Sequence, residues 1–235
     1  MKQYTDLFID FDDTLYDTRG SAQRALKELY SVCHLDEHFT SPDVFFNEYW
    51  KTNVQLWGEY SKGLISRDYL IVERFKRPLS VGNFDHIDDE MCLSMSDKFL
   101  DLCTSFTIVV EGAHDLLDYL TDKGYRLHLC SNGFHEVQFK KLRNAHMEKY
   151  FDTVILSEDA GANKPSKQFF DFALLKSKAC KANTLMIGDN FDTDMLGAMN
   201  AGIDTLLFNR WDQNFVPPKK VVFIVNALNE IKKIL

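Results

Sequence analysis

The chain has 235 residues, of which 45% are hydrophobic, 26% charged and 13% aromatic, and this ordinary globular composition excludes disordered, collagen-like and low-complexity classes. Twenty-seven Lys and Arg residues against 35 Asp and Glu give a net charge of -8. This acidic balance argues against a partner that is a nucleic acid polymer, but it leaves room for a small anionic substrate where a metal ion inverts the local field.

Neither a membrane span nor a secretory signal is visible in the sequence. The N-terminal apolar stretch, residues 7–9, stops at Asp10, and no apolar run approaches the ~18 residues of a transmembrane helix. The five cysteines are scattered, without the C-x-x-C pair that would indicate zinc or a thioredoxin-like site. We therefore expect reduced thiols in a cytoplasmic protein that acts without a membrane. The sequence carries no signal of oligomerisation, and a monomer or weak homodimer is the default expectation.

Short β-rich runs, which predict buried strands, occur near both ends of the chain. They lie at residues 6–10, 126–130, 153–156, 185–188, 205–208 and 221–224. Helical patterns alternate with them near residues 112–123, 135–147, 166–177, 192–200 and 225–235. Alternation of this kind predicts an α/β fold with a Rossmann-like, three-layer core, in which helices cover both faces of a parallel sheet.

The region between the first two strands has no convincing strand of its own. It reads instead as four helices at residues 22–32, 43–60, 67–75 and 85–102. Pro42 suits the first turn of the second helix, and Pro78 is expected to end the third. The sequence therefore predicts a core domain of residues 1–17 and 106–235, with a helical-bundle cap of residues 18–105 inserted after the first strand.

Two carboxylates close the first strand. Asp10 and Asp12 point the same way in an extended segment, because side chains alternate along a strand. They repel each other unless a cation or a proton lies between them. One interpretation is a nucleophile and a general acid/base around a hard metal ion, with Thr14 nearby; the alternative is a capping Asp and a turn.

Polar residues also follow three later strands. Ser131 and Asn132 offer a hydroxyl and a turn suited to a phosphoryl oxygen, although such a turn is common. Lys164 could neutralise a phosphate, or it could be a surface lysine. Asp189 is placed to bind a metal and Asp194 to hold the lysine or a metal-bound water, against the alternative of helix N-caps. Since ligands bind beyond the carboxyl ends of parallel strands, one shared site explains all these clusters.

The order and identity of these residues resemble the haloacid dehalogenase superfamily. Its four motifs are matched by Asp10-Phe11-Asp12-Asp13-Thr14, Ser131, Lys164-Pro165 and residues 188–194. The helical insert resembles the smaller helical cap of that superfamily. The resemblance implies that Asp10 attacks phosphorus to form an aspartyl-phosphate, and that Asp12 protonates the leaving alcohol and then activates water. It also implies a Mg²⁺ cofactor held by Asp10, the backbone carbonyl of Asp12, and Asp189.

The same resemblance assigns the phosphate-binding groups. Ser131, Asn132 and Lys164 would hold the transferring phosphoryl group, with Thr14 and Asp194 in support. Phosphoryl transfer depends on positioning and neutralisation more than on covalent chemistry, and a cation with Lys164 would screen the repulsion between a carboxylate and a phosphate ester.

Two features of the sequence narrow the range of candidate substrates. Asp12 favours a phosphatase, because dehalogenases of the superfamily release a halide without a proton and lack this Asp. Gln55-Leu56-Trp57 and Tyr60 resemble the cap of bacterial house-cleaning pyrimidine 5'-nucleotidases, which implies pyrimidine nucleoside 5'-monophosphates as small-molecule substrates. The alternatives are a sugar-phosphate or acylneuraminate-phosphate phosphatase, a sugar-phosphate mutase, and a nucleotide-binding protein without catalysis. Glu111 departs from relatives, which commonly carry Pro there.

Two pairs of helical residues could contact the substrate. Trp57 and Tyr60 are one turn apart and could stack on a base. Packing in the core of the bundle is the preferred alternative for Trp57 and an equal one for Tyr60. Arg67 and Arg74 share one helix face and could meet an anion, although we expect a solvated face instead.

Overall fold

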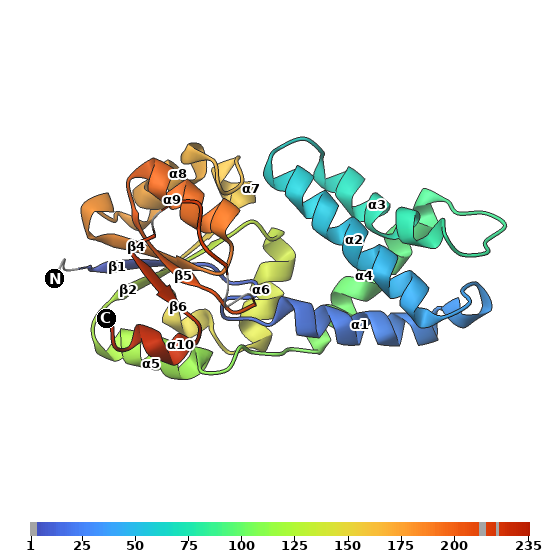
Figure 1. Cartoon of the computed structure of the whole chain (residues 1–235), viewed down its shortest axis with the longest axis horizontal. Helices are drawn as coiled ribbons and strands as arrows, with labels where there is room; N and C mark the ends of the chain where they lie inside the picture. Colours follow the sequence, from blue (N-terminus) through green and yellow to red (C-terminus); the bar gives the residue numbers. More distant parts are fainter. Residues whose placement is uncertain (1–3, 212–214, 220) are drawn as a thin grey trace. The chain divides into compact units, whose positions relative to one another are not determined.

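A parallel six-stranded sheet forms the centre of the core in a computed structural model that describes residues 4–211, 215–219 and 221–235 (Figure 1). Its strand order is β3-β2-β1-β4-β5-β6. The strands are β1 (Asp6–Ile9), β2 (Arg126–Ser131), β3 (Thr153–Leu156), β4 (Thr184–Gly188), β5 (Asp204–Phe208) and β6 (Phe223–Val225). All five pairings are parallel, so the predicted Rossmann-like α/β fold is confirmed.

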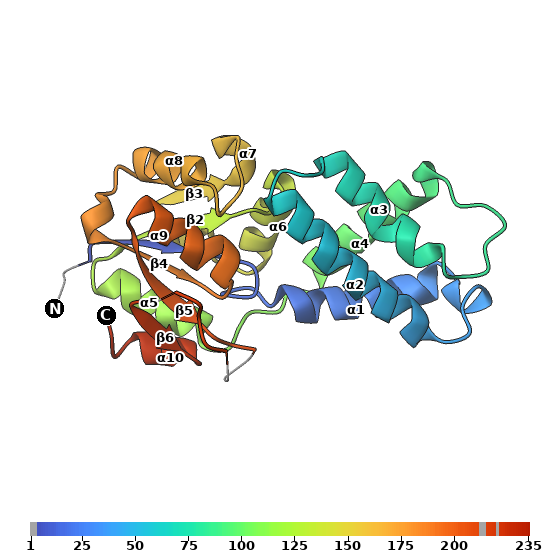
Figure 2. The same cartoon turned by 45° about the horizontal axis from the view of Figure 1, so that its top comes forward.

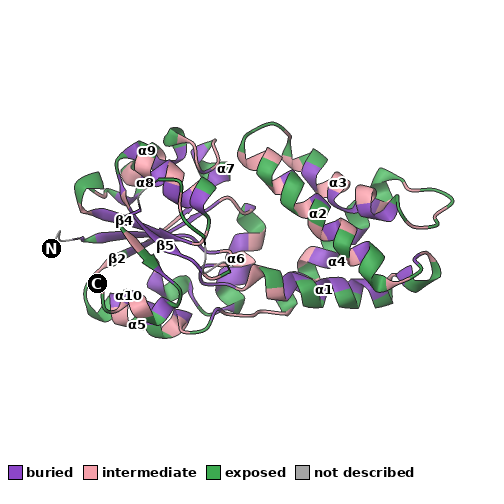
Figure 3. Ribbon diagram, viewed as in Figure 1, coloured by how far each residue is buried: buried purple, intermediate pink, exposed green. Residues whose placement is uncertain are grey.

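Helices cover both faces of this sheet (Figures 1 and 2). They are α5 (Ala113–Asp122), α6 (His135–Asn144), α7 (Ser157–Ala160), α8 (Lys167–Ser177), α9 (Leu196–Ala201) and α10 (Leu228–Ile231). Successive residues of β1 enter opposite layers: Leu7 and Ile9 pack in one apolar cluster and Phe8 in the other. Figure 3 shows the central strands largely buried between these layers, as expected for a parallel sheet, whereas the edge strand β6 exposes Ile224.

Two core helices differ from the predicted ranges. The expected helix at 225–235 shortens to α10, because Val225 pairs with Phe208 and so extends β6. The expected helix at 192–200 begins as a π-helical turn, Phe191–Met195, before α9. Both differences lie in the backbone hydrogen-bond pattern, which the apolar pattern of the sequence alone does not specify.

The chain divides into two units. The first contains Met1–Asp17 and Ile108–Leu235, and the second is Thr18–Thr107. The second unit, called the helical unit below, holds four long helices: α1 (Thr18–Val32), α2 (Pro42–Ser61), α3 (Arg67–Leu79) and α4 (Asp89–Ser105). Across the described ranges of both units, no helix has the length and hydropathy that crossing a bilayer requires.

A proline or a polar cap lies at the start of three of these helices. Pro42 lies in the first turn of α2, as predicted. Ser66 and Asp88 accept hydrogen bonds from the first turns of α3 and α4. Pro78 does not end α3, which continues to Leu79 and corrects the expectation. A proline at the penultimate position removes a single backbone donor, so the last turn tolerates it.

Arg74 is a second correction, because it lies inside the helical unit and not on a solvated face. It is 3% exposed, and its guanidinium donates a 2.6 Å hydrogen bond to Ser96 Oγ. The same group lies 5.7 and 5.2 Å from the ring centres of Phe75 and Phe99. Arg74 follows the buried Leu70 by one helical turn, so it shares the apolar face of α3.

We expect Ser96→Ala to lower the free energy of unfolding by about 1.5–3 kcal/mol, because a buried guanidinium loses a charge-assisted hydrogen bond. Urea unfolding measures this change. Ser94→Ala is the matched control, since Ser94 is exposed on the same helix, and it should stay within about 0.5 kcal/mol of the wild type. Equal effects of the two substitutions would contradict the role given to Ser96.

Candidate active site

Asp10 is fixed at the carboxyl end of β1. Its backbone N–H donates to Ile187 O at 2.8 Å, which continues the ladder between β1 and β4. The side chain is only 9% exposed. Its Oδ2 accepts a 3.0 Å hydrogen bond from Thr14 Oγ1, and its Oδ1 accepts one of 2.6 Å from Lys164 Nζ. Both oxygens of this carboxylate therefore have defined directions.

Lys164 is buried, which excludes the surface-lysine alternative. Its Nζ donates to Asp10 Oδ1 and Asp194 Oδ1, both at 2.6 Å, and to Cys130 O at 2.8 Å. Burial lowers the pKa of Lys164, but the attraction of Asp10 and then of Asp194 outweighs it, and the net shift is upward. The ammonium therefore stays charged between the two carboxylates.

Asn132 connects the loop after β2 to the loop that carries Lys164. Its Nδ2 donates to Lys164 O at 2.9 Å, and its Oδ1 accepts from Lys164 N at 2.7 Å. The side-chain amide of Asn132 is thus engaged in holding the lysine loop, and phosphate binding at this turn stays a prediction. Ser131, 1% exposed at the end of β2, accepts a 3.0 Å bond from Gly133 N.

The loop after β4 supplies the remaining carboxylates. Asp189 N donates to Thr14 Oγ1 at 3.1 Å, so one hydroxyl bridges the loops after β1 and β4. Asp194 Oδ2 accepts from Asn190 N at 3.2 Å. A Cβ at Gly188 would lie 2.3 Å from Asp194 Oδ2, so glycine is required there. The N-cap alternative fails for Asp194, because the side chain of Asn190 caps this turn.

Three of these carboxylates could hold a divalent cation. Oxygen atoms of Asp10, Asp189 and Asp194 lie within 4.8 Å of one another. Burial, opposed by Lys164 and reinforced by Asp194, raises the pKa of Asp10 to about 7. Burial and then repulsion from Asp10 also raise the pKa of Asp189 well above its usual value. This buried excess of negative charge on hard oxygen donors fits Mg²⁺.

Asp12 differs from the other three, because its carboxylate points to a helix and not to this cluster. Lys141 Nζ donates to its Oδ1 at 2.5 Å, and Gln138 Nε2 donates to its Oδ2. The family resemblance implies that the backbone carbonyl of Asp12 binds the metal. The contacts of the Asp12 side chain do not test that expectation.

We expect the metal-free protein to lose stability as the pH rises from about 4 to about 7. A carboxyl group whose pKa is raised in the folded state binds its proton more tightly than in the unfolded chain, so its stabilising effect is present at low pH and lost near pH 7. Mg²⁺ should therefore raise the melting temperature more at pH 8 than at pH 5.5, as measured by scanning calorimetry. An equal rise at both pH values would contradict this site.

Sequence reasoning missed Gln138 and Lys141, the two residues of α6 that bind Asp12. The usable signal was their spacing of three residues, which places both on one helix face after the Ser131 loop. A lysine in an amphipathic helix normally faces solvent, and for that reason the spacing alone did not indicate a site.

Trp57 and Tyr60 lie near the end of α2 in the helical unit. Their rings meet edge to face, with centres 5.6 Å apart, and both side chains are half-buried. Trp57, which we expected in the packed core of the bundle, is thus only partly enclosed. A substrate-selecting role for the pair remains a prediction.

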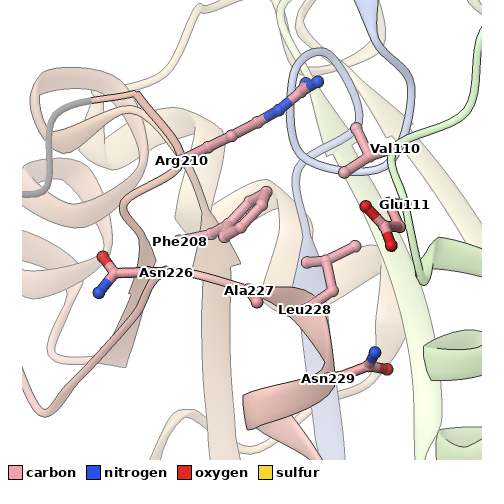
Figure 4. Close-up of a pocket in the computed structure, with 8 residues that line it drawn as sticks. All are labelled: Val110, Glu111, Phe208, Arg210, Asn226, Ala227, Leu228 and Asn229. Carbon is pink, nitrogen blue, oxygen red and sulfur yellow. The ribbon is translucent and has the colours of Figure 1, made fainter.

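A cavity of about 290 Å³ lies elsewhere in the core unit (Figure 4). It is lined by Val110, Glu111, Phe208, Arg210 and residues 226–229. None of the catalytic residues predicted from the sequence lines it, so this cavity is separate from the carboxylate cluster. Glu111, the departure from relatives noted above, belongs to this cavity.

An enzyme that moves a phosphoryl group needs a fixed nucleophile and a neutralising cation. The carboxyl edge of this sheet holds a buried carboxylate in contact with a buried lysine, an arrangement suited to an α/β enzyme of phosphoryl transfer. The family model described as haloacid dehalogenase-like hydrolase matches residues 7–202, and the chain belongs to this family.

Relatives support the same assignment over nearly the whole chain. HAD-hydrolase YfnB of Bacillus subtilis is 28% identical over 236 residues, covering 100% of this chain and 97% of that protein. The pyrimidine 5'-nucleotidase YjjG of Escherichia coli is 27% identical (97% and 96% covered), and PynA of Streptococcus pneumoniae, of the same name, is 31% identical (88% and 84%). Glyceraldehyde 3-phosphate phosphatases also match, at 27% identity. The prediction of an enzyme of the phosphatase class is therefore confirmed.

The solved structure of YfnB is also similar in fold. Its orthorhombic crystal form, bound to magnesium, has a TM-score of 0.86 and 26% identity, covering 100% of this chain and 99% of that chain. Magnesium is thus bound by a relative of the same fold and nearly the same length.

Proposed function

We propose that the protein is a Mg²⁺-dependent phosphomonoester hydrolase that acts on pyrimidine nucleoside 5'-monophosphates. The contact of Lys164 with Asp10 supports the chemistry most directly, because it places a buried cation on a buried carboxylate beside a cluster suited to Mg²⁺. The names of YjjG and PynA support the substrate class.

The reaction proceeds in two displacements at phosphorus. Asp10 attacks the phosphoryl group, and the bond to the leaving alcohol breaks as Asp12 gives that oxygen a proton. Asp12 then takes a proton from water, which attacks the aspartyl-phosphate, releases phosphate and restores Asp10. Lys164, in contact with the attacking carboxylate, supplies positive charge beside the phosphoryl group, and Ser131 holds a phosphoryl oxygen. Bound Mg²⁺ supplies the positive charge that screens the repulsion between carboxylate and phosphate.

Phosphate release from a panel of monoesters tests the proposal. The panel contains UMP, dUMP, dTMP, purine 5'-monophosphates, triose and hexose phosphates and an acylneuraminate phosphate, each with Mg²⁺ and with chelator. We expect Mg²⁺-dependent release that favours the pyrimidine nucleotides. Release that favours a sugar phosphate would agree with phosphomonoester hydrolysis but contradict the pyrimidine nucleotide as substrate. Nucleotide binding without any phosphate release would contradict hydrolysis itself.

We also propose the helical unit as the part that selects the substrate, with Trp57 and Tyr60 stacking on the base. Their adjacent, half-buried rings support this role. Replacing both by Ala should raise KM for UMP about 10-fold or more, since base–aromatic stacking contributes about 1–3 kcal/mol. An unchanged KM would move substrate selection to other residues.

A further inference from the structure

Two side chains of α6 hold the carboxylate of Asp12 from one side. Lys141 donates to Oδ1 at 2.5 Å, while Gln138 Nε2 donates to Oδ2 and also to Ser131 Oγ at 2.9 Å. The Ser131 hydroxyl also donates to Oδ2, at 3.5 Å. These contacts fix the plane of the carboxylate.

Both side chains of α6 belong to buried residues of the core unit. Lys141 is 7% exposed and Gln138 1% exposed, whereas the side chain of Asp12 keeps 28% of its surface. Lysines are almost never buried unless they are paired, and the ammonium of Lys141 also lies 5.1 Å from the ring centre of Tyr16. The side chain of Lys141 is therefore enclosed by the protein. The solvent-exposed part of this ion pair is the side chain of Asp12.

Gly133 shows that this arrangement constrains the chain around it. A Cβ there would lie 1.8 Å from Gln138 Nε2 and 2.6 Å from Gln138 Cδ. The backbone of Gly133 does not have a positive φ, so the space taken by the Gln138 amide is the reason for glycine. The loop after β2 thus provides a gap through which Gln138 reaches Asp12.

We propose that Lys141 and Gln138 are positioning residues for Asp12, which orient its carboxylate toward the leaving-group oxygen and the attacking water. This inference rests on the proposed function, because it assigns the residues that make the acid/base group effective. A positioned acid or base contributes about 10²–10⁴-fold to a rate, and a loss of orientation forfeits part of that factor.

Leaving-group dependence tests the inference. Asp12 must protonate the alcohol of a nucleotide, whereas p-nitrophenolate leaves without a proton. In Lys141→Met and Gln138→Leu we expect kcat for UMP to fall about 10–10²-fold, with KM changed less than about 3-fold. With p-nitrophenyl phosphate the first turnover should keep its rate and the steady state should slow, because Asp12 still activates water in the second step. A burst of p-nitrophenolate would then appear.

Further variants separate positioning from a structural role. Lys141→Arg keeps the charge and should recover most of the UMP rate. Gly133→Ala should reproduce the Gln138→Leu pattern, since the added methyl displaces the amide. Arg143→Met, at an exposed position of the same helix, should leave both rates within about 2-fold of the wild type.

The outcomes separate this inference from the proposed function. A wild-type protein that releases no phosphate from any monoester overturns both. An active wild type in which Asp12→Asn produces the burst, but neither Lys141→Met nor Gln138→Leu does, overturns the positioning role alone. Equal losses on UMP and in the first turnover of p-nitrophenyl phosphate would also overturn it. If Lys141→Met does not fold, Gln138→Leu and Gly133→Ala decide the question.

Discussion

Asp10→Asn should reduce phosphate release from UMP by at least about 10⁴-fold, the loss expected when a covalent nucleophile is removed. The amide keeps the size of the carboxylate and can still accept the Thr14 hydrogen bond. It cannot attack phosphorus as a carboxylate does, so no aspartyl-phosphate forms. The substitution also removes one of three clustered negative charges, so the protein should remain folded.

Steady-state phosphate release with excess Mg²⁺ measures this effect, and calorimetry confirms that the variant is folded. Asp192→Asn is the control, because Asp192 is exposed in the same loop as Asp194 and bears no assigned role. It should stay within about 2-fold of the wild type. An Asp10→Asn protein with a rate within about 10-fold of the wild type would exclude the double-displacement mechanism.

The sheet could be predicted because each buried parallel strand appears in the sequence as a short apolar run, as in β1 and β4. Prediction was weaker where long-range pairing decides the structure. Val225 was expected in a helix, but it pairs with Phe208 of β5 and therefore belongs to β6. Arg74 is a similar case, since helical spacing placed it on a face but did not show that Ser96 of another helix would accept a hydrogen bond from it.

The grouping of the candidate site residues could be predicted where those residues follow the ends of parallel strands. Asp10, Ser131 and Asp189 all lie where the topology of a parallel sheet brings chain ends together. Lys141 was not predictable in this way, because a lysine on a helix gives no sign of its burial until the partner carboxylate is located. The contact of the Asn132 side chain with the backbone of Lys164 was likewise not visible in the sequence.

Lys164→Met should have a large effect on both stability and activity. It leaves the buried carboxylates of Asp10 and Asp194 without their shared cation, and breaking a buried ion pair from one side costs about 3–5 kcal/mol. Loss of Lys164 also removes an influence that lowers the pKa of Asp10. The loss of stability should therefore be larger at pH 8, where the carboxylates are ionised, than at pH 5.5. Turnover should fall about 10²–10³-fold, the effect of losing one charge-stabilising donor.

Urea unfolding at the two pH values and phosphate release measure these effects. Lys167→Met is the matched control, because Lys167 forms an exposed ion pair with Asp171 in the same segment, and it should change stability by less than about 1 kcal/mol. Adding Asp194→Asn to Lys164→Met should restore part of the lost stability, since it removes one unpaired carboxylate. If Lys164→Met is as stable as Lys167→Met at both pH values, the charge balance assigned to this cluster is wrong.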